Sequence, residues 1–71
     1  MLDKQIAIRI KEHSLRATVE LSTLLVEIQD KVSSEDYEII KRGIGRTIGR
    51  IQLEILDFVY YQHPELDHHK Y

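Results

Sequence analysis

The chain has 71 residues, a formal charge of −2 and no cysteine. A domain of this length lies near the lower limit at which one hydrophobic core supports a fold, and without cysteine neither a disulfide nor a thiolate zinc site can reinforce it. Small chains of this composition depend on regular helix packing or on oligomerisation. The small net charge gives no overall bias toward nucleic acid or an anionic membrane.

The first predicted element is a helix over about residues 4–32. No glycine or proline interrupts this segment, and Asp3 suits the N-cap position. The longest apolar run, Leu24 to Val26, is far too short to span a bilayer, and early charges argue against a signal peptide. We therefore expect a protein without a membrane partner, located in the cytoplasm.

The second predicted element is a helix over about residues 34–62. Ser33 suits its N-cap, and Val32 and Tyr37 have the spacing of a hydrophobic staple. Pro64 disfavours helical conformation at His63 and ends the helix there. Two helices of similar length joined by a short turn predict an all-α fold, an antiparallel αα-hairpin over residues 1–63, followed by a polar tail at 64–71.

Each predicted helix carries two apolar stripes, because side chains advance about 100° per residue. The main stripes are expected to pack against each other inside the hairpin. They contain Ile6, Ile10, His13, Ala17, Leu21, Leu24, Leu25, Ile28 and Val32 on the first helix, and Tyr37, Ile40, Ile44, Ile48, Ile51, Ile55, Phe58 and Val59 on the second.

The second stripe of the first helix contains Ile8, Leu15, Val19 and Val26. A single hairpin leaves it exposed, although burying each such side chain is worth about 1.5–3 kcal/mol. We therefore predict that these four residues form an oligomer interface, most simply in a homodimer that makes a four-helix bundle. The alternative is that they are isolated surface residues covered by lysine and arginine stems.

The segment from Arg42 to Arg50 contains three glycines inside a predicted helix. Each glycine costs about 1 kcal/mol relative to alanine, so a compensating role is expected. Gly45 and Gly49 stand one turn apart, which favours close approach of another helix or a partner. A weak or kinked helix is the alternative.

Arg42, Arg46 and Arg50 recur every four residues beside these glycines. This ridge has three interpretations: a solvated helix edge, a surface for an acidic protein, or a contact with a phosphate backbone. Tyrosine and arginine often dominate binding energy at interfaces. The predicted partner-binding residues are Arg42, Arg46, Arg50, Gly45, Gly49, Leu56 and Tyr60.

No residue constellation predicts catalysis, a cofactor or a metal site. The serines lack histidine–carboxylate partners, and the glutamates lack the Glu-x-x-His pattern of a di-iron bundle. His63, His68 and His69 cluster in the tail without the fixed spacing of a metal site. His13 lies on the main stripe and is expected to be a core or interface histidine. The chain is therefore expected not to be an enzyme.

Equal helices, a capped turn at Val32–Asp36 and a short polar tail resemble the helical-hairpin dimers of the Rop family and small helical immunity proteins. This resemblance is one of outline, and it carries over no residue. It implies a protein-binding module, such as an immunity-type inhibitor, an antitoxin-like neutraliser or an adaptor that acts by occlusion. The alternatives are a Rop-like bundle that binds RNA or nucleotides through paired arginine ridges, and a purely structural oligomerisation unit.

Overall fold

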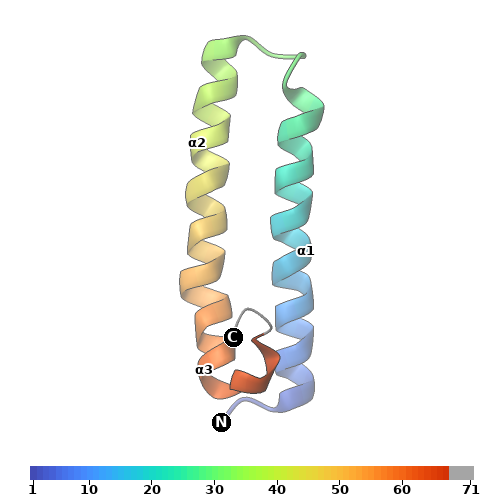
Figure 1. Cartoon of the computed structure of the whole chain (residues 1–71), viewed down its shortest axis with the longest axis vertical. Coiled ribbons are helices and arrows are strands. Elements are labelled where there is room, and N and C mark those ends of the chain that lie inside the picture. Colours follow the sequence, from blue (N-terminus) through green and yellow to red (C-terminus); the bar gives the residue numbers. More distant parts are fainter. Residues whose placement is uncertain (68–71) are drawn as a thin grey trace.

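The computed structural model describes residues 1–67, which form an all-helical hairpin (Figure 1). Its elements are α1 (Lys4–Ile28), α2 (Ser34–Ile51), the π-helix η1 (Gln52–Leu56), α3 (Asp57–Gln62) and the 3₁₀ turn η2 (Pro64–Leu66). α2, η1 and α3 follow one another without a break and run antiparallel to α1. The hairpin measures 46 × 23 × 16 Å, so it is a single layer of two helices.

Both predicted N-caps are present. The Asp3 carboxylate accepts hydrogen bonds from the backbone N–H groups of Gln5 and Ile6, at 3.1 and 3.3 Å. The Ser33 hydroxyl oxygen accepts one from the N–H of Asp36, at 3.0 Å. These local bonds satisfy donors that the first helical turn leaves unpaired, which is why each helix begins at the predicted residue.

The end of the first helix differs from the prediction. α1 ends at Ile28 rather than near Val32, and the chain then turns, with the N–H of Lys31 bonded to the Ile28 carbonyl. Ser33 must adopt an extended conformation to cap α2, so the preceding residues leave the helix to reverse the chain. The second helical segment ends at Gln62, as predicted, because His63 leaves helical conformation before Pro64.

The face of α1 that packs against the second helical segment follows a seven-residue repeat. Ala7 and Ser14 are buried, and Leu21 and Ile28 are half-buried. Thr18, between Ser14 and Leu21, is also half-buried. Such a repeat is typical of two helices packed along a shallow left-handed crossing. The predicted main stripe of α1 is therefore partly wrong, since small residues sit at the centre of the interface and Ile6 and Leu24 are exposed.

The π-helix η1 shifts the register of the second helical segment by one residue. The N–H of Asp57 bonds to the carbonyl of Gln52, five residues earlier instead of four. Leu56 and Val59 consequently lie in the core, with exposures of 2% and 0%. The prediction that Ile55 and Phe58 pack there is wrong, because these side chains are 39% and 53% exposed.

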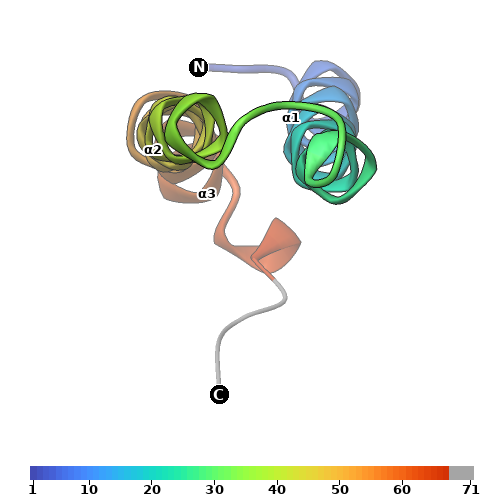
Figure 2. The same cartoon turned by 90° about the horizontal axis from the view of Figure 1, so that it is seen from above.

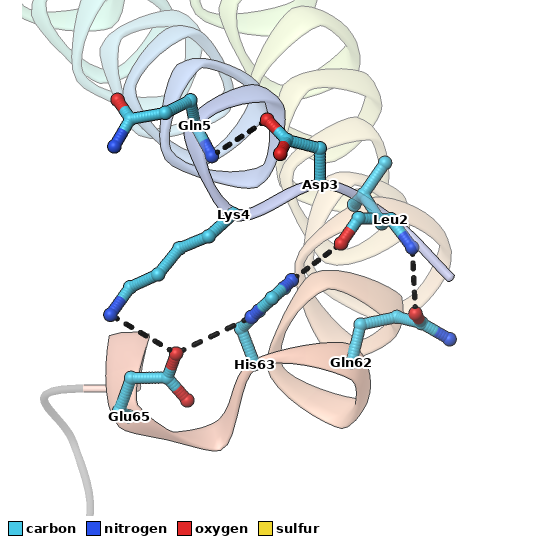
Figure 3. Close-up of polar contacts among 7 residues, drawn as sticks. All are labelled: Leu2, Asp3, Lys4, Gln5, Gln62, His63 and Glu65. Carbon is cyan, nitrogen blue, oxygen red and sulfur yellow. Dashed lines mark hydrogen bonds and ion pairs between the residues drawn. The ribbon is translucent and has the colours of Figure 1, made fainter.

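The two ends of the described chain meet at the open end of the hairpin (Figure 3). The N–H of Leu2 donates to the side-chain oxygen of Gln62 at 3.0 Å, and Nε2 of His63 lies 2.7 Å from the Leu2 carbonyl. Nδ1 of His63 lies 3.3 Å from the Glu65 carboxylate, which also pairs with Lys4 at 3.4 Å. Both ring nitrogens of His63 therefore face acceptor oxygens. We call these five residues the terminal clasp.

The beginning of the tail folds back onto α1. The Nζ group of Lys11 donates to the carbonyl of Leu66 at 2.6 Å, and Leu66 is half-buried. From above, this segment leaves one side of the hairpin while the N-terminus leaves the opposite side (Figure 2). The predicted tail residues His68 and His69 lie outside the described residues.

The terminal clasp should make stability depend on acid pH. The hydrogen bond from the backbone N–H of Glu65 is the largest cause that holds the pKa of the Glu65 carboxyl below its usual value. Desolvation opposes this effect, and hydrogen bonds from the Lys4 and His63 side chains lower the pKa further. A lowered pKa in the folded state stabilises the fold above the unfolded-state pKa and loses that contribution as pH falls through the folded-state value.

We therefore expect the Glu65→Gln variant to be less stable than the wild type at neutral pH. The difference between the two proteins should vanish as the pH falls well below 4.5, the ordinary value for this carboxyl. Urea unfolding followed by circular dichroism between neutral and acid pH measures it. A gap that persists unchanged at the acid end would show that Glu65 acts without its charge.

Candidate interaction surfaces

The two flanks of the hairpin carry different sets of side chains. Ile55, Ile6 and His13 line one hollow. Each of them directly precedes a core residue, namely Leu56, Ala7 and Ser14 respectively. Residues that precede core positions on the two antiparallel helices therefore share one side of the pair. Residues that follow core positions lie on the opposite side.

The first side is hollowed along α1. A depression of about 380 Å³ is lined by Ile6, Ile10, His13 and Ile55 with Arg9 and Ser14. A second, open depression of about 600 Å³ continues along Ala17, Leu21 and Leu24 with Glu20 and Glu27, and extends round the outside of α1 to Thr23 and Val19. We define the hollowed face by its apolar and aromatic members, Ile6, Ile10, His13, Ala17, Leu24 and Ile55.

All six residues of the hollowed face belong to the predicted main stripes, which were expected to pack inside the hairpin. His13 was expected in a core or interface, yet it is exposed in the hairpin. The π-turn brings Ile55 to this side, and burial of Ala7 and Ser14 turns Ile6 and His13 outward. A seven-residue spacing of small residues, Ala7 and Ser14, was the available sequence signal.

The opposite side joins two sets of residues that were predicted separately. Leu15 follows Ser14, and Gly45 follows Ile44, so the predicted oligomer stripe and the glycine pair share this side. Val19 and Val26 are 62% and 73% exposed. We define the notched face by Leu15, Val19, Val26, Gly45 and Gly49.

Ile8 belongs to the same row of α1 but is half-buried. Lys4, Ile8, Lys11 and Leu15 recur at the spacing of one helix face, and Lys4 and Lys11 bind residues of the tail. The tail thus lies at the lower end of the notched face, next to Ile8. The open part of this face begins at Leu15.

The glycines of α2 have no packing role inside the hairpin. A methyl group added at Gly43, Gly45 or Gly49 would meet no atom within 4 Å outside its own helical surroundings. All three glycines lie within the regular helix α2, so the alternative of a helix kinked at these glycines is not seen. Their cost of about 1 kcal/mol each is therefore not offset by any close approach within residues 1–67.

The predicted partner-binding residues differ in how far they are exposed. Leu56 is buried in the core by the register shift, so it is not part of a surface in this hairpin. Tyr60 is half-buried, and its burial, followed by the Asp67 and Asp57 carboxylates, raises the pKa of its phenol. Gly45 is exposed and Gly49 is half-buried.

The three arginines of the predicted ridge are exposed along α2. Arg50 pairs with Glu54 one turn later, which neutralises one end of the ridge. Within the described chain, Arg42 and Arg46 form no ion pair. The ridge is thus two unpaired guanidinium groups, and its role in binding an acidic protein or a phosphate stays a prediction.

Comparisons with protein-family models, curated proteins and solved structures find no match for this chain. None of the helices in residues 1–67 has the length and apolar character needed to cross a bilayer. The same residues contain no group of three or more histidine, cysteine, aspartate or glutamate side chains placed to hold a metal.

Proposed function

We propose that the protein is a non-enzymatic protein-binding module that covers a helix of another protein along its hollowed face. One observation carries this proposal: the described hairpin buries only four hydrophobic side chains, whereas twelve large hydrophobic ones are exposed. Exposed apolar side chains in this number favour a binding surface on a small domain, and Ile6, Leu24 and Ile55 of this set lie on the hollowed face. A protein that acts in this way is an inhibitor or an adaptor, since covering a partner's surface is its only activity.

The shape of the hollowed face favours a helical partner. Its apolar residues recur along α1 from Ile6 to Leu24, over roughly 27 Å at 1.5 Å per residue. An amphipathic helix laid into such a groove places apolar residues at every third or fourth position. Arg9 stands at one end, and Glu20 and Glu27 at the other, so the groove also distinguishes the two directions of a charged helix.

A photo-crosslinking residue at Ala17 tests this proposal in the cell that makes the protein. We expect a covalent adduct with one defined protein, and we expect Ile6→Glu to reduce the adduct about tenfold or more, because a charge replaces an apolar contact. Ile39→Glu is the matched control, since Ile39 is also an exposed isoleucine, at 67% against 48% for Ile6, and does not line the hollow.

The hollowed face is the wrong site if Ile6→Glu and Ile39→Glu give equal amounts of adduct. A crosslink to nucleic acid instead of protein would favour the alternative function of the arginine ridge. Circular dichroism of both variants checks that the hairpin remains folded, as expected for two partly exposed positions.

A further inference from the structure

The hairpin has more surface than a compact chain of its mass. Its accessible area is 5545 Å², whereas about 4,600 Å² is expected for a folded monomer of 8.4 kDa. Its radius of gyration is 14.8 Å, against about 11 Å for a compact domain of this length. The surplus area is close to the ~800 Å² that each partner contributes to a protein interface of standard size.

The notched face carries both halves of a complementary contact. Leu15, Val19 and Val26 project from α1, and Gly45 and Gly49 leave an unfilled notch on α2. Counted from the turn between Ile28 and Ser34, Val19 lies near the level of Gly45, and Leu15 near the level of Gly49, to within about two residues or 3 Å. Projections and notches therefore stand side by side at similar heights.

We infer that the notched face binds a second copy of this chain about a two-fold axis parallel to the helices. Such an axis lays α1 of each copy over α2 of the other, at the same level and in antiparallel direction. Val19 of one copy then packs on Gly45 of the other, and Leu15 packs on Gly49. The two-fold axis repeats both contacts, so each occurs twice in the dimer. The product is a four-helix bundle in which the absent side chains let the helices approach closely.

A second copy fits this face better than an unrelated partner. The contact is isologous, because one surface supplies every projection and every notch that the pairing requires. The tail, held by Lys4 and Lys11, limits the contact at its lower end and leaves the region from Leu15 to Val26 open. The six residues that define the hollowed face lie on the opposite side and stay free for the partner proposed above; only Val19, at the margin of the larger depression, also belongs to the notched face. The inference rests on that proposal only in treating the hairpin as an interaction module.

Three glycine variants test the inference. We expect wild-type protein to be a dimer in sedimentation equilibrium, and the double variant Gly45→Leu, Gly49→Leu to weaken the dimer about tenfold or more, because the added side chains occupy the space of Val19 and Leu15. Gly43→Leu is the control. It lies in the same helix with equally empty surroundings, but it precedes the core residue Ile44 and so faces the other side.

A monomeric wild type would overturn the inference, and so would equal effects of the Gly43 and Gly45–Gly49 variants. Neither result would change the expected crosslink from Ala17 to a partner protein. The dimer and the partner-binding function are therefore tested separately.

The direction of the pairing has its own test, because the chain has no cysteine of its own. Mixing a Val19→Cys chain with a Gly45→Cys chain and a short thiol crosslinker should give a covalent heterodimer. If Val19→Cys couples instead with Leu15→Cys of another copy, the hairpins pair with their turns at opposite ends, and the proposed axis is wrong.

Discussion

Replacing Leu56 with alanine should destabilise the hairpin by about 2–5 kcal/mol, whereas replacing Ile55 with alanine should change its stability by about 1 kcal/mol or less. Leu56 is 2% exposed in the core, and its truncation leaves a cavity between the helical segments. Ile55 lies beside it on the exposed hollowed face. A domain of this length has only about 4–11 kcal/mol of total stability, so Leu56→Ala should unfold over a visibly lower range of urea.

This pair of variants tests the π-turn directly. In an uninterrupted α-helix the two residues would exchange roles, with Ile55 in the core and Leu56 on the flank. Urea denaturation monitored by far-ultraviolet circular dichroism gives both free energies of unfolding. A larger loss for Ile55→Ala than for Leu56→Ala would mean that the second helical segment is a regular α-helix.

Deleting Leu53 should leave the hairpin as stable as the wild type or more stable. A π-turn holds one residue more than an α-helical turn, so removing one residue from η1 returns the segment to regular geometry. Leu56 and Val59 would then keep their register with Ile44 and Ile51. The deleted side chain itself is 67% exposed, so little packing is lost with it.

The matched deletion is Arg16, which is exposed in the regular helix α1. No π-turn stands there to absorb the change, so one half of α1 must rotate by about 100°. Either Ala7 and Ser14, or Leu21 and Leu25, then leave the interface, and we expect the hairpin to unfold. If the two deletions destabilise the protein equally in thermal unfolding, the extra residue of η1 is required for the fold.

The parts of the fold that depend on local chemistry were predictable from the sequence. Asp3 and Ser33 cap their helices through bonds to residues two or three positions away, and Pro64 acts on its immediate neighbour. The hairpin itself follows from these boundaries. The end of the first helix was predicted less accurately. Residues 29–32 are compatible with a helix, and they leave it only because the chain has to reverse before Ser33.

The choice of the buried face was not local. Periodicity favours the most apolar stripe of α1, but the helices approach along Ala7 and Ser14, whose small side chains allow close packing. The segment Gln52–Leu56 contains no glycine or proline from which the π-turn could have been predicted. It exists because Leu56 and Val59 fit the core together, which is a property of both helices at once.

The candidate site was predictable in pieces. Helical spacing identified Leu15, Val19 and Val26 as surplus to one hairpin, and it identified Gly45 and Gly49 as unusual. Their common side could not be deduced without the core register of both helices. The hollowed face was not predicted for the same reason. Without the core register, its residues were expected in the interior.

The terminal clasp has a consequence for how the chain acquires its structure. It joins residues 60 and 61 positions apart, whereas the turn after Ile28 pairs residues within a few positions. Loop-closure entropy penalises distant pairs, so pairing starts most readily at the turn and proceeds residue by residue toward the ends. Each new contact then closes only a short additional loop. The clasp is the last part to form in such a sequence and the first to open, so the two ends of the chain are the region where the native state is least protected.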